Sequence, residues 1–179
     1  MIVDIKYKTT VNHVINYHFS KIEKGKATLL ESTFNADSKE DLISNYNLQA
    51  SLNTKIKNKF IHLSLSPNPK DNLSQDEFLK IAHTYIEKMN LENRPYFIVE
   101  HSDSSNKHFH IVTTSVDDHG KSYNAFNNFQ KNKKACQEIE VLYNLTKTLE
   151  KVEYKKMSLN EKNNLKYSYL NLINSVLYL

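Results

Sequence analysis

Apolar and polar positions follow two different periods along the chain, and the two periods predict an alternation of strands and helices. Alternation with a period of two, typical of half-buried strands, predicts strands at residues 2–8, 27–34, 59–66, 95–101 and 107–116. Apolar residues at helical spacing predict helices at 10–19, across 39–50, at 74–89 and from about Asn128 onwards, with a break near 157–160. The order predicts an α+β fold in which helices cover a central antiparallel sheet.

Local signals mark where several of these elements begin and end. Ser74 is followed three residues later by Glu77, which is the spacing of a capping box at a helix start. Residues 35–38 offer further helix caps, and the strand at 59–66 stops at Pro67. Gly120 follows a polar stretch and is free to take a positive φ, which predicts a turn.

The length of 179 residues suits one domain with a short appendage. We expect a main domain at residues 1–150 and a helical extension at 151–179. No run approaches the roughly 18 apolar residues that a membrane span needs, and the first residues do not resemble a signal peptide, so we expect a cytoplasmic protein without a membrane partner. The single cysteine, Cys136, lies in a helical pattern and is expected to be a structural thiol.

The charge balance adds a moderate indication about partners. The net charge is +4, and nearly all cations are lysines, Arg94 being the only arginine. A lysine acts as a point charge, which suits neutralisation of phosphates better than bidentate reading of bases. The cluster of Lys21, Lys24 and Lys26 is a candidate phosphate contact, although a solvated lysine-rich surface would give the same composition.

The most informative segment is HSDSSNKHFHIV, residues 101–112. His108 and His110 are two apart on a predicted strand, so both imidazoles project from one face while Phe109 packs into the other. His101 ends the preceding strand and would lie beside them if the two strands pair. Three neutral imidazoles form a divalent-metal site with open positions, and Asp103 is placed to bind the second nitrogen of one of them. The alternative is that the histidines are scattered polar residues on an exposed sheet face.

These residues carry a family resemblance. Two histidines flanking a hydrophobic residue resemble the motif of the HUH endonucleases, and the run that includes His101 and Asp103 resembles the third motif of the relaxase/mobilisation nuclease family, the MobA-like group. The resemblance covers roughly residues 1–145. It implies an HUH-relaxase-like sheet fold, a metal-dependent nick in single-stranded DNA at an origin of transfer, and a covalent 5′-phosphotyrosine. It also implies a role in plasmid mobilisation, with accessory mobilisation proteins as further partners.

The resemblance also indicates a nucleophile. Family members place the tyrosine shortly after the first strand, where Tyr17 stands in NYHFSKIEKGKATLL. A tyrosine, with a reference pKa of ~10, needs a metal or carboxylate to help remove its proton. Tyr17 is therefore assigned as catalytic together with Asp103, and Tyr7 is the second choice. His13 and His18 flank this segment and could assist, although we interpret each as a surface histidine.

HLSLSPNPKDNLS, residues 62–74, resembles the family's second motif, in which a serine at a strand end contacts DNA. Ser64 and Ser66 alternate onto one face with His62, so all three could line the cleft, and ordinary strand filling is the alternative. The family resemblance predicts Mg²⁺ or Mn²⁺, whereas an all-imidazole ligand set by itself favours Zn²⁺, Ni²⁺ or Co²⁺.

Three other functions fit parts of the pattern. A three-histidine metallohydrolase would use metal-bound water and need no tyrosine. A single-stranded DNA-binding module would have lost the chemistry, and a structural sheet protein would carry incidental histidines. Mobilisation relaxases usually run well beyond this length, so the chain is interpreted as either a truncated or an unusually short member.

Overall fold

The computed structural model describes residues 1–103 and 107–147. Their elements follow the order predicted from the sequence. The strands are β1 (Ile2–Lys8), β2 (Ala27–Ser32), β3 (Phe60–Ser66), β4 (Tyr96–His101) and β5 (His108–Thr114), and the helices are α1 (Asn12–Glu23), α2 (Lys39–Ser51), the 3₁₀ turn η1 (Pro69–Asp71), α3 (Gln75–Lys88) and α4 (Asn128–Leu142). The extension predicted at residues 151–179, with its break near 157–160, lies outside the described residues.

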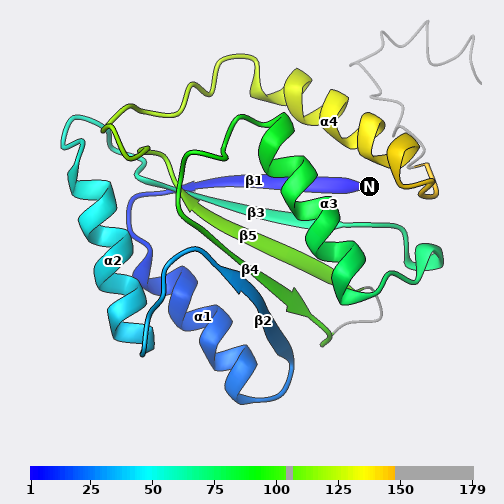
Figure 1. Ribbon diagram of the computed structural model, residues 1–179, viewed down its shortest axis with the longest axis horizontal. Helices are drawn as coiled ribbons and strands as arrows, with labels where there is room; N and C mark the ends of the chain where they lie inside the picture. Colours follow the sequence, from blue (N-terminus) through cyan, green and yellow to red (C-terminus); the bar gives the residue numbers. More distant parts are fainter. Residues whose placement is uncertain (104–106, 148–179) are drawn as a thin grey trace, which may run out of the picture. The chain divides into compact units, whose positions relative to one another are not determined.

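The five strands form one sheet in the order β1-β3-β5-β4-β2 (Figure 1), and each neighbouring pair is antiparallel. This confirms the predicted α+β class with a central antiparallel sheet. β4 and β5 are joined through the segment that follows His101, and their register sets His101 opposite His108. β3 lies on the other side of β5, with Ser64 opposite His110. β3, β5 and β4 therefore lie side by side at the centre of the sheet, although they span residues 60 to 114 of the chain.

Each face of the sheet buries its own hydrophobic core. On one face Ile61, Leu63, Ile98, Phe109 and Ile111 pack with residues of α3 and α4. On the other face Phe60, Phe97, Val99 and Val112 pack with residues of α1 and α2. The alternation of side chains along β3, β4 and β5 explains why neighbouring residues belong to different cores.

The second face is covered over only part of its width. Val3 and Ile5 of β1 point to the α3 side and pack there, whereas Ile2, Asp4 and Lys6 point the other way and are exposed. Asp4 pairs with Ser64 and Lys6 with His62 in the adjacent strand. The β1–β3 edge on the α1 side is thus a polar surface next to the helices.

The ends of the elements agree with the local sequence signals in most cases. Ser74 and Glu77 form the predicted capping box at the start of α3, and Ser38 caps α2 by accepting a hydrogen bond from the Asp41 amide. Gly120 has a φ of 75°, as its turn requires. Several bounds differ by a few residues: α1 runs from Asn12 to Glu23, β2 ends at Ser32 after an irregularity between Leu29 and Glu31, and β5 ends at Thr114.

Cys136 is buried in α4, and its burial raises the pKa of the thiol to about 11. A thiol with so high a pKa holds little thiolate at neutral pH, which agrees with a structural role and excludes it as an activated nucleophile. Within residues 1–103 and 107–147, the helices are all too short or too polar to cross a membrane.

Candidate active site

Five histidines meet on the α1 side of the sheet. β4 contributes His101, β5 contributes His108 and His110, β3 contributes His62, and α1 contributes His18. Their rings contact one another closely, with His110 lying between 4.5 and 5.0 Å, centroid to centroid, from each of the other four. The cluster therefore joins α1 and β3 to β4 and β5, two strands that follow them much later in the sequence.

The three histidines predicted from the sequence motif lie together. His101 pairs with His108 across β4 and β5, and His110 lies on the same face two residues further along. Phe109, between them, is fully buried in the core on the opposite face. One ring nitrogen from each of the three histidines lies within 4.8 Å of the others, which is a spacing that a single metal ion can span.

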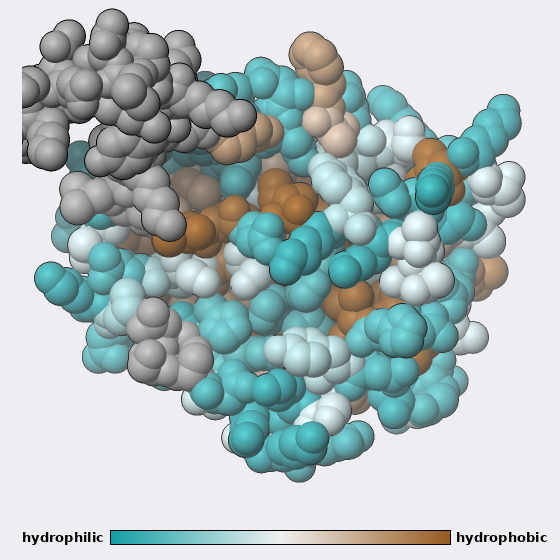
Figure 2. Space-filling model, turned by 180° about the vertical axis from the view of Figure 1, so that it is seen from behind, coloured by the Kyte–Doolittle hydropathy of each residue, from teal (hydrophilic) through white to brown (hydrophobic). Residues whose placement is uncertain are grey.

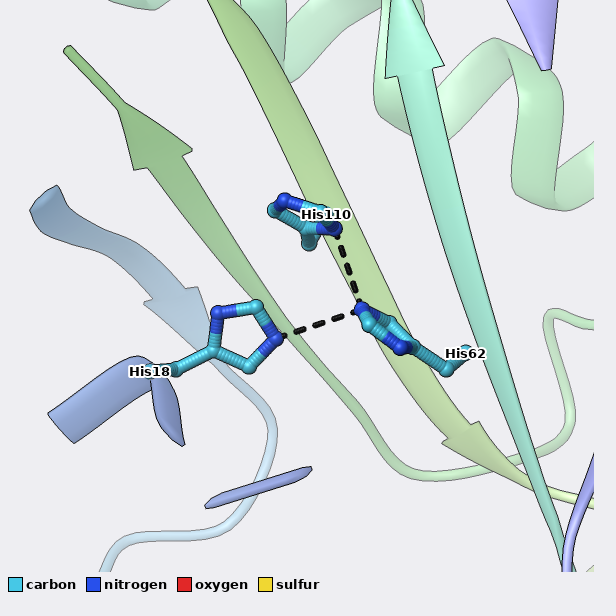
Figure 3. A group of neighbouring side chains, drawn as sticks. All are labelled: His18, His62 and His110. Carbon is cyan, nitrogen blue, oxygen red and sulfur yellow. Dashed lines mark hydrogen bonds between the residues drawn. The ribbon is translucent and has the colours of Figure 1, made fainter. Parts of the chain in front are cut away.

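His18 and His62 are the two histidines of the cluster that the motif did not include (Figure 3). The interpretation of His18 as a surface residue is wrong, because it is fully buried. It lies one helical turn after Val14 and Ile15, the buried residues of α1, and that spacing was a signal that could have identified it. His18 Nδ1 lies 2.9 Å from His101 Nε2, and its Nε2 lies 3.3 Å from His62 Nε2. His13, by contrast, is exposed as expected.

Burial lowers the pKa of four of the clustered imidazoles, those of His18, His62, His101 and His110, and keeps them neutral. It lowers the pKa of His18 to about 2 and the pKa values of His62 and His101 to about 4, and the neighbouring rings lower them further. The pKa of His110 is also lowered, first by burial and then by His18 and His62. Neutral imidazoles have lone pairs free for a metal, so the electrostatics suit ligands rather than cations.

The cluster also leaves buried nitrogens without a protein partner. Among the described residues, neither His110 Nε2 nor His101 Nδ1 has a hydrogen-bond partner. A buried polar atom left unpaired costs roughly 1–3 kcal/mol. A cation bound through either nitrogen would remove the cost of that atom, and the triad of His101, His108 and His110 can hold a divalent metal.

Tyr17 lies at the edge of the cluster. Its ring centroid is 5.1 Å from that of His18 and 5.6 Å from that of His101, and 47% of the residue is exposed. Tyr7 belongs to a different site, because its hydroxyl accepts a hydrogen bond from Asn128, at the start of α4. Of these two candidate tyrosines, Tyr17 is the one next to the histidines.

A comparison with protein families identifies the chain. A family model described as relaxase, MobA/VirD2-like, nuclease domain, matches residues 17–145, which include Tyr17 and all five histidines of the cluster. The chain belongs to this family. A search of curated proteins finds no significant match. Relaxase nuclease domains bind single-stranded DNA and use a divalent metal, and membership supports a nicking-type nuclease function for this chain.

In this relaxase domain Lys21, one residue of the lysine cluster, meets Asp103 beside the tyrosine. Lys21 Nζ donates a hydrogen bond to Asp103 and also lies 5.7 Å from the centre of the Tyr17 ring. This bond lowers the pKa of the Asp103 carboxyl, so it stays ionised. Asp103 Oδ1 is 3.9 Å from His101 Nδ1, which is longer than a hydrogen bond. Lys24 and Lys26 are exposed in the turn after α1.

A pocket and two serines extend the site along the polar edge of the sheet. The pocket has a volume of about 280 Å³ and is lined by Lys8, Thr9, Thr10, His13, Val14, Tyr17 and His62. Ser64 and Ser66 are half-buried on the same face as His62, as predicted, and Ser64 lies opposite His110. Ser64 and Ser66, the DNA contacts that the resemblance indicated, thus continue the strand face that carries His62.

Proposed function

We propose that this relaxase-family domain nicks single-stranded DNA at an origin of transfer, with Tyr17 as nucleophile and a divalent ion held by His101, His108 and His110. One observation carries the proposal: the exposed Tyr17 lies against His18 and His101, whose imidazoles are buried and neutral. The reaction would serve mobilisation of plasmid DNA in the cytoplasm, with accessory mobilisation proteins as further partners.

The histidine triad fits the metal that the family uses. When bound, the ion would act as a Lewis acid toward a non-bridging oxygen of the scissile phosphate. Mg²⁺ or Mn²⁺ is the family's expectation, although imidazole ligands favour Zn²⁺, Ni²⁺ or Co²⁺. The buried nitrogens of His101 and His110 that have no partner among the described residues support this assignment.

The chemical step is a transesterification. The Tyr17 oxygen attacks the phosphorus, and the bond between phosphorus and the 3′-oxygen breaks. The products are a 5′-phosphate esterified to Tyr17 and a free 3′-hydroxyl. The net effect on protons is that the leaving 3′-oxygen gains the proton that the tyrosine loses. One phosphodiester replaces another of similar energy, so the step is reversible and can rejoin the strand without a nucleotide cofactor.

Charged residues around Tyr17 would position the DNA. Lys21 is tied to Asp103 over the tyrosine ring, so its ammonium group is held near the place where the phosphate must bind. Asp103 then acts as a positioning residue for Lys21, and as a nearby negative charge for His101. We assign Lys24, Lys26, Ser64 and Ser66 as contacts to the DNA that flanks the scissile phosphate. This DNA must be unpaired to enter the pocket beside Tyr17.

Formation of a covalent adduct tests the proposal. Labelled single-stranded DNA that carries the origin of transfer is incubated with the protein and Mn²⁺, and an SDS-resistant complex is expected, with the nucleotide on Tyr17. Tyr17→Phe should abolish the complex while metal and DNA binding persist. Tyr7→Phe is the matched control and should form the complex.

Two outcomes would contradict parts of the proposal. An adduct on Tyr7 would keep the reaction and reassign the nucleophile. Cleavage by Tyr17→Phe without any adduct would instead show attack by metal-bound water, and the chain would then be a metallohydrolase of the same fold.

A further inference from the structure

The histidine cluster has more ligands than one metal position uses. His101, His108 and His110 form the triad of the proposed nuclease, and His18 and His62 lie outside it. A second group that could hold a metal consists of His18, His62 and His110, again with one nitrogen from each within 4.8 Å of the others. The two groups share His110 and come from different sets of elements.

Two of the distances in the second group are close to those of tetrahedral coordination (Figure 3). His62 Nε2 lies 3.3 Å from His18 Nε2 and 3.0 Å from His110 Nδ1. Zinc binds histidine nitrogen at about 2.0–2.1 Å, so two ligands of a tetrahedral ion are separated by roughly 3.3 Å. These nitrogens thus lie close to the spacing that a common metal ligand would give them.

Hydrogen bonding accounts poorly for the same contacts. In a neutral imidazole each nitrogen is either a donor or an acceptor. His62 Nε2 faces His18 Nε2 and His110 Nδ1, so one proton or one lone pair must serve both partners. His18 is further occupied on its other side by His101 Nε2. A cation removes the conflict, because all three nitrogens can direct lone pairs toward it.

We propose that His18 Nε2, His62 Nε2 and His110 Nδ1 form a second metal position for a tetrahedral transition-metal ion such as Zn²⁺ or Co²⁺. Three imidazoles without a carboxylate favour such ions over Mg²⁺. His110 joins this position through Nδ1, whereas its Nε2 is the nitrogen without a partner among the described residues. A neutral imidazole has one lone pair, so His110 serves one of the two positions at a time.

An ion in this position would link three elements. His18 belongs to α1, His62 to β3 and His110 to β5, so the ion would fasten the helix that carries Tyr17 to the centre of the sheet. An ion that binds the folded chain and not the unfolded chain raises the free energy of unfolding. The position is therefore both a binding site and a structural link for α1.

Cobalt spectroscopy on histidine variants tests the second position. His101→Ala/His108→Ala removes two ligands of the nuclease triad and leaves His18, His62 and His110 in place. This variant should still bind Co²⁺, with the intense visible absorption of tetrahedral cobalt and a raised Tm. Adding His62→Ala should remove the absorption and the Tm shift. The matched control adds His119→Ala instead, an exposed histidine after β5, and should keep both.

The inference is overturned if His101→Ala/His108→Ala binds no Co²⁺, or if adding His62→Ala leaves the absorption unchanged. Should the double variant fail to fold, the same test is made with fewer changes by comparing His108→Ala with His62→Ala/His108→Ala. Only the first of these two variants should then show the cobalt absorption. The readout is metal binding and not nicking. A chain that forms the Tyr17 adduct but fails this test keeps the proposed function and loses only the second position.

Discussion

At the scale of single residues, the buried histidines make stability depend on pH. Burial lowers the pKa of His18 to about 2, whereas the unfolded chain would have a value near 6.5. Below pH 6.5 the unfolded state therefore binds a proton that the folded state does not, and stability is lost as the pH falls. The contribution of neutral His18 to the free energy of unfolding is fully present above about pH 6.5. It decreases progressively as the pH falls toward the pKa of His18 in the folded state.

We expect the metal-free protein to be less stable at pH 5 than at pH 7, with His18 accounting for about 2 kcal/mol of the difference at most. His18→Gln should reduce the pH dependence by up to that amount, whatever its effect on stability at pH 7. The measurement is urea unfolding at both pH values in the presence of a chelator. His119→Gln, an exposed change, is the control, and an unaltered pH dependence in His18→Gln would contradict the burial argument.

The residues of the site differ in how far the sequence predicts them. His101, His108 and His110 belong to a short motif on two consecutive strands. They come together as soon as those two strands pair with each other. His18 and His62 come from α1 and β3, and their approach depends on the strand order β1-β3-β5-β4-β2. Periodicity reveals that His62 shares a face with Ser64, but it does not reveal which strand lies next to β3.

At the scale of elements, the N-terminal cap of helix α3 can be tested for its effect on stability independently of the histidine site. Ser74 accepts a hydrogen bond from the Glu77 amide, and Glu77 in turn accepts one from the Ser74 amide. Ser74→Ala removes the first bond, and loss of an N-cap costs about 1 kcal/mol. We expect the free energy of unfolding, measured in urea at pH 7, to fall by this amount. Ser51→Ala, at the exposed end of α2, is the control, and an equal loss in both variants would contradict the assignment to the cap.

The elements themselves were largely predictable, because their apolar periods and caps agree with their packing. The exceptions have local causes. The predicted strand at 27–34 is interrupted by a register shift between Leu29 and Glu31, and its pairing with β4 resumes and ends at Ser32 opposite Phe97. The helix predicted at 10–19 continues to Glu23, because Phe19 and Ile22 still pack against the core on this face, and Gly25, with a φ of 64°, marks the turn that follows. The spacing of His18 from Val14 and Ile15 places it on the buried face, but its polar side chain adds no apolar signal to the pattern.

At the scale of the whole molecule, the two faces of the sheet have different surroundings. α1 and α2 cover part of one face and leave the polar edge formed by β1 and β3, whereas α3 and α4 pack on the other face. Seen from the side opposite to α3, the described surface is mostly hydrophilic, with hydrophobic residues in separate patches (Figure 2). A strand of DNA bound at Tyr17 would cross the face of the sheet that α1 and α2 cover in part.

Salt dependence distinguishes the two faces. Each lysine–phosphate contact with single-stranded DNA contributes about −0.7 to the log–log slope of affinity against salt. Replacing Lys21, Lys24 and Lys26 by alanine should therefore flatten the slope by about two units if all three contact phosphates. Lys21 shares its charge with Asp103, so Asp103→Asn should steepen the slope rather than flatten it. Fluorescence anisotropy over a range of salt concentrations measures both variants.

The matched control is the triple alanine variant of Lys131, Lys133 and Lys134, which removes the same charge from α4 on the opposite face. Its slope should equal that of the wild type, because a general loss of positive charge does not remove a specific phosphate contact. If the α4 variant flattens the slope and the variant at the end of α1 does not, the DNA crosses the other face. Tyr17 would then lie away from the bound strand, and the proposed attack on the scissile phosphate would have no path.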